Sequence, residues 1–406
     1  MEPKQTLFRN RPLTEQERKN WLVLEAIRKS GPLTKTEISR ITGLNIVTVS
    51  NYVNNYISCG LALAKGFNSS TGGRKPELVE LNSGFGFAMG IDLGVSGLAQ
   101  SEMIAVLTDL SGKVVTRIKK PRPEGDIGRL LTRTIGLISE LIENCSVEVE
   151  KIKGVVIGVN GILDERAGTV REFSKNASTA DYLSLINRIE REFGIPAFVS
   201  NAATMAVFGE KIICLNREAQ NIIYMHSDVD CGIMINGEIY KGISGSAGEL
   251  GFNELNGNDF IWAQKHPLLR PRGLDLGILS QARRILEDGV ESKISENPAV
   301  EITTETIVEA AREGDKLAME LIEDAGVTLG MRIAYLVNVI NPEIVIIGGG
   351  VEQAESLLLD PVRKMVRKYA FEEAASAVRI IPSCLGEDAV SMGAAGFVIR
   401  AAFVGA

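Results

Sequence analysis

The stretch FGFAMGIDLG, residues 85–94, decides the fold of most of this 406-residue chain. Apolar and small residues continue up to Asp92, and Gly94 follows two positions later. This is the pattern of a buried β-strand that opens into a tight turn. Strands of this kind are typical of α/β sheets, in which functional residues gather where strands end. We therefore expect an α/β domain to begin close to residue 83.

Strands and helices alternate along the rest of the chain, and they do so twice in the same order. Each set starts with strand, turn and strand, continues with a helix and closes on a buried strand. The first set comprises a strand pair within 101–115, a helix near 124–144 and the strand IKGVVIGV (152–159). The second set comprises a strand pair within 221–240, a helix over 314–340 and the strand EIVIIGGG (343–350). Two such sets predict two related α/β lobes with a cleft between them.

The composition excludes several classes of protein. Apolar residues make up 45% of the chain and charged residues 23%, as in ordinary soluble proteins. No stretch approaches the roughly 18 uninterrupted apolar residues of a membrane helix, and residues 1–12 lack an apolar signal core. The five cysteines are scattered without a CxxC pair, which indicates a reducing compartment and argues against a zinc knuckle. We expect a cytoplasmic protein that makes no membrane contact.

Charge is distributed unevenly along the chain. Residues 1–82 contain 12 Lys or Arg, seven Glu and no Asp, which gives a net charge of +5. Because the whole chain carries −7, the remaining residues carry −12. A basic front segment on an acidic body favours contact between that segment and an anionic polymer such as DNA.

Two capping boxes stand close together in this front segment. TEQE (14–17) and TKTE (34–37) each place a hydroxyl at a helix start and a carboxylate three residues later. They predict helices over about 15–29 and 35–42. Gly43 suits the left-handed turn that would end the second helix.

A third helix is expected over 46–58, with Asn45 as its cap and apolar residues on one face. Residues 61–81 then give two short strands around a Ser/Gly-rich tip. Three helices followed by such a hairpin predict a winged helix-turn-helix, with a bundle that mediates only protein contacts as the alternative. The expected DNA-contacting residues are Asn45, Thr48, Ser50 and Asn51 in the third helix and Arg74 and Lys75 at the wing tip.

Several further motifs carry a family resemblance. They are Asp92-x-Gly94, GVVIGVNGILD (154–164), FVSNAA (198–203), GSAGELGF (245–252), NPEIVIIGGGV (341–351) and LGEDAVSMGAA (385–395). In this order they resemble the ROK family of sugar kinases and sugar-responsive repressors. The resemblance covers about residues 14–405 and implies a two-lobed α/β body of the actin/hexokinase (ribonuclease H-like) type.

The resemblance also implies domain boundaries. The winged helix-turn-helix domain is expected over residues 1–82 and the N-terminal lobe over 83–200. The C-terminal lobe with the dimerisation surface is expected over 201–390, and the last helix, 391–406, is expected to return to the N-terminal lobe.

The phosphate-binding loops depart from the pattern of the family's kinases. The first loop of the kinases reads Asp-x-Gly-Gly-Thr, but here Val95 follows Asp92 and Gly94. The second reads Gly-Thr-Gly-Ile-Gly, and only Gly232 remains of it. The glycines on the adenosine side, Gly348, Gly349 and Gly350, are retained.

The position of the catalytic base is altered as well. In the kinases, Glu-Asn-Asp-Ala-Asn supplies the aspartate that takes the proton of the sugar hydroxyl, and the matching residue here is Ala202. A methyl group accepts no proton, so we expect no catalytic residue. Substitution by a neighbouring acid, namely Asp164, Asp228 or Asp230, is the alternative.

The residues that remain for a sugar are Asn160, Gly161, Asn201, Glu249 and Phe252. In a purely structural interpretation, Asn201 caps the following helix and Glu249 pairs with a surface base. Phe252 replaces a histidine of the family's zinc site, and no cysteine lies near 253–266, so no zinc and no other cofactor is expected. Packing of Phe260 and Trp262 is expected to hold this segment instead.

Together these features predict a sugar-responsive transcriptional regulator, most simply a homodimeric repressor that binds operator DNA and a sugar or sugar phosphate without phosphorylating it efficiently. An ATP-dependent sugar kinase of the glucokinase or N-acetylglucosamine kinase type is the alternative. A DNA-binding protein whose vestigial cleft responds to a partner protein is a third possibility.

Overall fold

The computed structural model describes residues 13–67, 77–95, 101–123, 127–164, 168–171, 179–215, 219–227, 230–250, 276–295 and 302–404. Its internal contacts divide the chain into two compact units. The first comprises Met1–Gly161, Gly168–Ser200 and Ser391–Ala406, and the second comprises Ile162–Ala167 and Asn201–Val390. Among the described helices, none has the length and apolar character that crossing a membrane requires.

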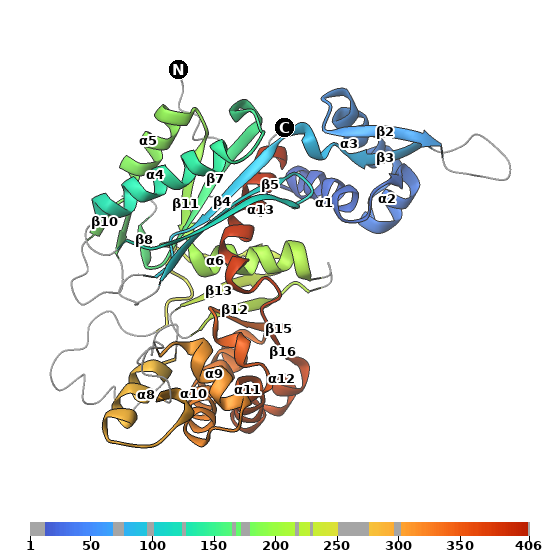
Figure 1. The fold of residues 1–406 in the computed structure, drawn as a ribbon. Coiled ribbons are helices and arrows are strands. Elements are labelled where there is room, and N and C mark those ends of the chain that lie inside the picture. The colour runs from blue at the N-terminus through green and yellow to red at the C-terminus, as the bar shows by residue number, and fades with distance from the viewer. Residues whose placement is uncertain are drawn as a thin grey trace. The chain divides into compact units, whose positions relative to one another are not determined.

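The N-terminal part of the first unit, which we call the head, has three helices and a three-stranded sheet (Figure 1). Its elements are α1 (Glu15–Ser30), β1 (Leu33–Thr34), α2 (Lys35–Thr42), α3 (Ile46–Ser58), β2 (Ala62–Phe67) and β3 (Glu77–Leu81), and the strand order is β1-β3-β2. These bounds confirm the three helices that the sequence predicts. Strands β2 and β3 are antiparallel, as the expected hairpin requires.

Local signals explain why the head folds this way. Both capping boxes form, at Thr14 and at Thr34. Gly43 ends α2 in the left-handed region, with φ of 72°. The face of α3 that packs inward consists of Val49, Val53 and Tyr56, each at most 2% exposed.

The body of the first unit is built on a five-stranded sheet with the order β11-β7-β4-β5-β6. Its strands are β4 (Phe87–Asp92), β5 (Glu102–Asp109), β6 (Val114–Pro121), β7 (Ile152–Val159) and β11 (Ala197–Asn201), and its helices are α4 (Ile127–Glu143), α5 (Leu183–Phe193) and α13 (Ala389–Val404). The short strands β9 (Thr169–Arg171) and β10 (Thr179–Asp181) form an antiparallel pair. Helix α13 lies against β4 at Gly90, where a Cβ atom would approach the carbonyl oxygen of Ser391 to 1.9 Å.

The second unit contains a five-stranded sheet with the order β14-β13-β12-β15-β16. Its strands are β12 (Ile222–His226), β13 (Asp230–Ile235), β14 (Glu238–Ile239), β15 (Ile344–Gly348) and β16 (Arg379–Pro382). Its helices are α6 (Ala202–Gly209), η4 (Glu210–Cys214), α8 (Ile278–Glu287), α9 (Thr304–Arg312), α10 (Lys316–Ile340), α11 (Ser356–Tyr369) and α12 (Glu372–Ala377), with short turns η7 (Val351–Ala354) and η8 (Gly386–Asp388). The short strand β8 (Ile162–Asp164) also belongs to this unit.

The two sheets repeat one topology. In each, an antiparallel meander of three strands is extended by two strands that follow later in the chain, and β4 pairs parallel with β7 as β12 does with β15. Helices α9, α10 and α11 gather on one side of the second sheet, and α6 lies on the other (Figure 1). This arrangement confirms the expected fold class, an α/β body made of two related lobes.

Candidate functional site

A group of polar side chains meets where β12 and β13 join in the second unit. The Nδ1 atom of His226 lies 3.2 Å from Oδ1 of Asp230. The other carboxylate oxygen of Asp230 accepts a 3.0 Å hydrogen bond from Nδ2 of Asn201. His226 is 6% exposed and Asp230 1%, so this is a buried polar network, held at the carboxyl end of β12.

Asn201 has a structural role in addition to this contact. Its Oδ1 accepts a 2.9 Å hydrogen bond from the backbone N–H of Thr204, which caps α6. The next residue, Ala202, is fully buried in the first turn of that helix. Asn201, which is expected to bind sugar, is therefore a helix cap that also bonds to Asp230. Ala202, to which the resemblance assigns the position of the kinase base, is a packed methyl group.

Glu249 lies beside Asp230, because the two residues form a β-bridge. The bridge continues in a 2.8 Å hydrogen bond from the Cys231 N–H to the Gly248 carbonyl. Gly248 has φ of +100°, and a Cβ atom there would meet the Cys231 oxygen at 1.8 Å, so only glycine lets this segment approach β13. Two acidic side chains are thus presented together.

The electrostatics of the group follow from its burial. Burial raises the pKa of the Cys231 thiol, and the nearby carboxylates of Asp230 and Glu249 raise it further, while Arg332 of α10 lowers it. Burial likewise raises the pKa of Glu352 at the start of η7. Asn201, His226, Asp230 and Glu249, which we call the polar cluster, offer amide, imidazole and carboxylate groups that can bind the hydroxyls of a small polar ligand.

The candidate residues of the first unit lie at the ends of β4 and β7. Oδ1 of Asp92 accepts a 2.9 Å hydrogen bond from the Gly94 N–H, and the Val95 N–H donates to Oγ of Ser101 at 2.8 Å. Asn160, 7% exposed, donates from Nδ2 to the Gly94 carbonyl at 3.0 Å. Two amides of the loop that would surround a phosphate are therefore already engaged within the protein.

The glycines associated with nucleotide binding have packing roles. A Cβ atom at Gly232 would meet the Ala203 oxygen at 2.0 Å, because β13 lies directly against α6. A Cβ atom at Gly348 would meet the Tyr224 hydroxyl at 2.0 Å. Gly349 and Gly350 have φ of +91° and +98°, which fits a turn after β15. Gly161, which is one of the residues predicted to bind the sugar, also has positive φ, at +133°.

The residues expected to contact DNA share the front of α3. Asn45 is the cap of the helix, and its Oδ1 accepts a 2.8 Å hydrogen bond from the Thr48 N–H. Asn45 and Asn51 are exposed, whereas Thr48 and Ser50 are half-buried. The prediction missed the exposed apolar residues between them, Ile46 and Val47, which are 45% and 66% exposed.

Some predicted residues lie outside the described part of the chain. They are Arg74 and Lys75 at the wing tip, Asp228, Phe252, Phe260 and Trp262. Asp164, named as a substitute base, lies exposed at the end of β8.

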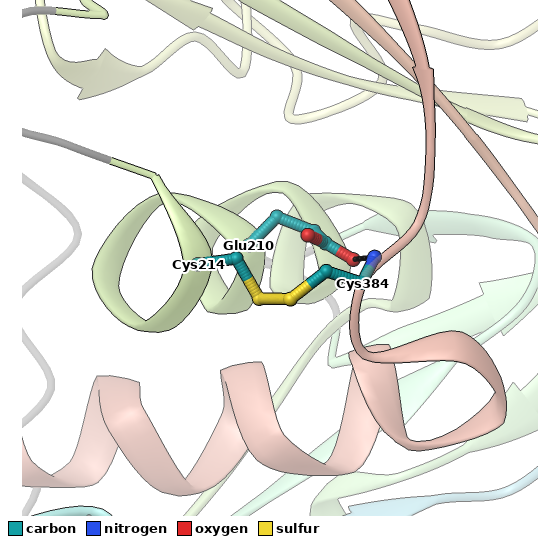
Figure 2. A group of neighbouring side chains, drawn as sticks. All are labelled: Glu210, Cys214 and Cys384. Atoms are coloured by element: carbon teal, nitrogen blue, oxygen red, sulfur yellow. Dashed lines mark hydrogen bonds between the residues drawn. A yellow bond between two sulfur atoms is a disulfide. The ribbon is translucent and has the colours of Figure 1, made fainter.

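A second group in the second unit brings Glu210, Cys214 and Cys384 together (Figure 2). Their ligand atoms lie within 4.8 Å of one another, and the two cysteines form a disulfide with Cα atoms 6.4 Å apart. The scattered spacing of the cysteines gave no sign of this pairing. A sulfur in a disulfide is no thiolate ligand, so the group could hold a metal only after reduction.

Comparison with known proteins places the chain in a family. The sequence model of the ROK family matches residues 88–268 and 283–401. The chain belongs to the ROK family. The match begins after the head. A xylose repressor of Caldicellulosiruptor bescii is similar along the whole chain, with 30% identity over 383 residues, which is 93% of this chain and 94% of the repressor.

Solved structures of the ROK family share this fold. A transcriptional regulator described as a homologue of the Escherichia coli MLC protein has a TM-score of 0.73 at 22% identity and covers 96% of this chain and 97% of that one. A glucokinase of Streptomyces griseus, solved with glucose and AMPPNP, has a TM-score of 0.61 at 22% identity. It covers 76% of this chain and 98% of the kinase.

Proposed function

We propose that this ROK protein is a sugar-responsive transcriptional regulator, most simply a repressor, that binds operator DNA through its head. The observation that carries the proposal is the similarity to a xylose repressor over 93% of this chain and 94% of the repressor. The head supports it, since three helices and an antiparallel hairpin have the order of a winged helix-turn-helix. We place the protein in the cytoplasm, where it would meet DNA.

The polar cluster is the proposed binding site of the effector. Glu249 supplies carboxylate oxygens, Asp230 beside it bonds to the Asn201 amide, and Asn201 is fixed at a helix start. Carboxylate and amide groups of this kind accept and donate to sugar hydroxyls. D-Xylose is the first effector to test because of the relative's name.

Several features oppose phosphoryl transfer. Ala202 stands at the position of the base and is fully buried. Asp230, which could replace the base, is bonded to Asn201 and near His226, so its carboxylate is engaged in the buried network. A lost general base costs roughly 10²–10⁴ in rate. We therefore propose that the chain is not an efficient kinase and needs no zinc or other cofactor.

We further propose that the protein binds as a homodimer. Helix α3 carries no lysine or arginine, so phosphate contacts must come from other parts of the head and from a second subunit. Two heads on a palindromic operator double the contact surface and match the symmetry of the DNA.

Fluorescence anisotropy tests the proposal, with labelled DNA from upstream of the protein's own coding region and a panel of pentoses and hexoses. We expect saturable binding that one sugar weakens at least about tenfold. A coupled ADP-release assay over the same panel should stay below about 0.01 s⁻¹, against about 1–100 s⁻¹ for kinases. Turnover of tens per second without DNA binding would support the kinase instead.

The role of the polar cluster is tested by Asp230→Asn. The change keeps the shape but removes a charge, so we expect effector affinity to fall at least about tenfold while DNA binding persists. Asp288→Asn, an exposed acid that follows α8, is the matched control and should leave both unchanged.

A further inference from the structure

The disulfide between Cys214 and Cys384 joins parts of the second unit that are 170 residues apart in sequence. Cys214 ends η4 and is half-buried, and Cys384 follows β16 and is exposed. The other three cysteines, Cys59, Cys145 and Cys231, are unpaired. Cys384 is an exposed residue, so we expect a small thiol to reach its side of the bond.

Both bonded segments belong to the second unit. The chain enters the second unit at Asn201, and α6 and η4 lead from there to Cys214. It leaves the second unit after Val390, shortly beyond Cys384. The disulfide thus joins the end of η4 to the segment that follows β16.

Glu210 holds the segment that follows β16 in place by hydrogen bonds that do not depend on the disulfide. Its Oε1 accepts hydrogen bonds from Oγ of Ser383 and from the backbone N–H groups of Cys384 (3.0 Å) and Leu385 (3.1 Å). This carboxylate is 1% exposed. Because Glu210 keeps the backbone of Cys384 in place, the sulfurs stay close enough for the bond to re-form after reduction.

The disulfide is also connected to the polar cluster. Asn201 caps the start of α6, and Cys214 ends the helical segment that continues it. Fixing the far end of the helical segment should make the position of Asn201 more rigid.

We propose that Cys214 and Cys384 are a redox modification site that sets the affinity of the polar cluster for its effector, an inference that rests on the proposed function. A low-molecular-weight thiol of the glutathione class attacks Sγ of Cys384, the disulfide breaks, and Cys214 leaves as a thiolate that takes up a proton. A second thiol attacks the mixed disulfide, which releases Cys384 as a thiol and the oxidised small disulfide. The oxidised form binds the effector more tightly because the cluster is held in place before binding.

The test compares the full-length protein after treatment with dithiothreitol and with glutathione disulfide. Peptide mapping after alkylation should find the Cys214–Cys384 bond only in the oxidised sample. Oxidation should raise the melting temperature by at least about 5 °C, because the bond closes a long loop. Calorimetric titration with D-xylose should show affinity at least about fivefold higher in the oxidised form.

Variants separate this effect from general oxidation. Cys384→Ser and Cys214→Ser should each abolish the shifts in melting temperature and affinity. Cys59→Ser, which removes an exposed cysteine outside the pair, should keep both.

The proposal would be overturned if mapping found glutathione on Cys59 or Cys145 and no Cys214–Cys384 bond. Equal affinities in the two states would overturn it too. One Zn²⁺ bound per reduced chain that prevents the bond from forming would assign the group to a metal instead. Absence of xylose binding in both states would reject the proposed effector, whereas the mapping result would still decide the modification site.

Discussion

The side-chain amide of Asn20 in α1 donates a 3.0 Å hydrogen bond to the backbone carbonyl of Phe403 in α13, 383 residues away. The Oδ1 atom of the same side chain accepts a hydrogen bond from the hydroxyl of Tyr56 in α3. Asn20 is 6% exposed, and all three residues belong to the first unit. One buried side chain therefore connects the proposed DNA-reading helix to the C-terminal helix of the body.

Asn20→Ala removes this connection. It leaves the buried Phe403 carbonyl without its partner, while the Tyr56 hydroxyl keeps its 2.9 Å hydrogen bond to the backbone carbonyl of residue 20, so we expect the free energy of unfolding to fall by about 1–3 kcal/mol. Urea denaturation measures the change. Asn144→Ala, at an exposed position after α4, is the control and should have little effect. Equal stability of the two variants would mean that Asn20 does not hold head and body together.

Two glycines should respond to alanine in opposite ways. At Gly232 a methyl group would meet the Ala203 oxygen at 2.0 Å, so Gly232→Ala should lower the free energy of unfolding by roughly 2 kcal/mol or more. Gly136 lies exposed within α4, with nothing within 4 Å of an added methyl. Gly136→Ala should raise stability by about 0.5–1 kcal/mol. Urea denaturation of both variants checks the signs, and a tolerated Gly232→Ala would contradict the close contact of β13 with α6.

Glu352 should make stability depend on pH. Burial raises its pKa above the usual 4.5 of a glutamate, so the protonated form is favoured in the folded protein. Its contribution to the free energy of unfolding is therefore complete below the pKa of the unfolded state and is lost as the pH rises through the pKa of the folded state. Glu352→Gln lacks this loss, so its stability relative to the wild type should increase between pH 4.5 and pH 8. A stability difference that stays constant over this range would show that the carboxyl is not perturbed.

Sequence reasoning succeeded where the controlling interactions are local. Capping boxes at Thr14 and Thr34 involve residues three apart, and the buried face of α3 repeats at helical spacing. The alternation of strands and helices was sufficient to predict two related lobes. Each of these signals lies within about one turn of helix or one strand.

The features that sequence reasoning missed depend on long-range contacts. His226 meets Asp230 because β12 and β13 are antiparallel, and no motif marks such a pair. Cys214 and Cys384 are 170 residues apart, and their spacing resembles that of unpaired cysteines. The close packing of Gly232 against α6 likewise depends on a contact between two elements.

Val47 should read thymine methyl groups if α3 enters the major groove. The side chain is 66% exposed at the front of α3, where an apolar residue has no structural reason to face solvent. Replacing operator thymines by deoxyuridine removes the methyl groups and should cost the wild type about 1 kcal/mol, roughly fivefold in affinity. Val47→Ala should be much less sensitive to the replacement, as judged by anisotropy.

The control for this experiment is Val115→Ala, which changes an exposed valine of β6 outside the head. It should lose affinity on deoxyuridine DNA as the wild type does. Equal losses in the wild type and Val47→Ala would show that Val47 does not contact the thymines.

A footprint on the DNA upstream of the protein's own coding region, with and without D-xylose and related sugars, tests the central claim most directly. We predict two protected half-sites spaced by about 10 base pairs or a multiple of that distance, and loss of the protection when the effector is added. No protection at micromolar protein, together with rapid ADP release in the presence of a sugar, would contradict the account.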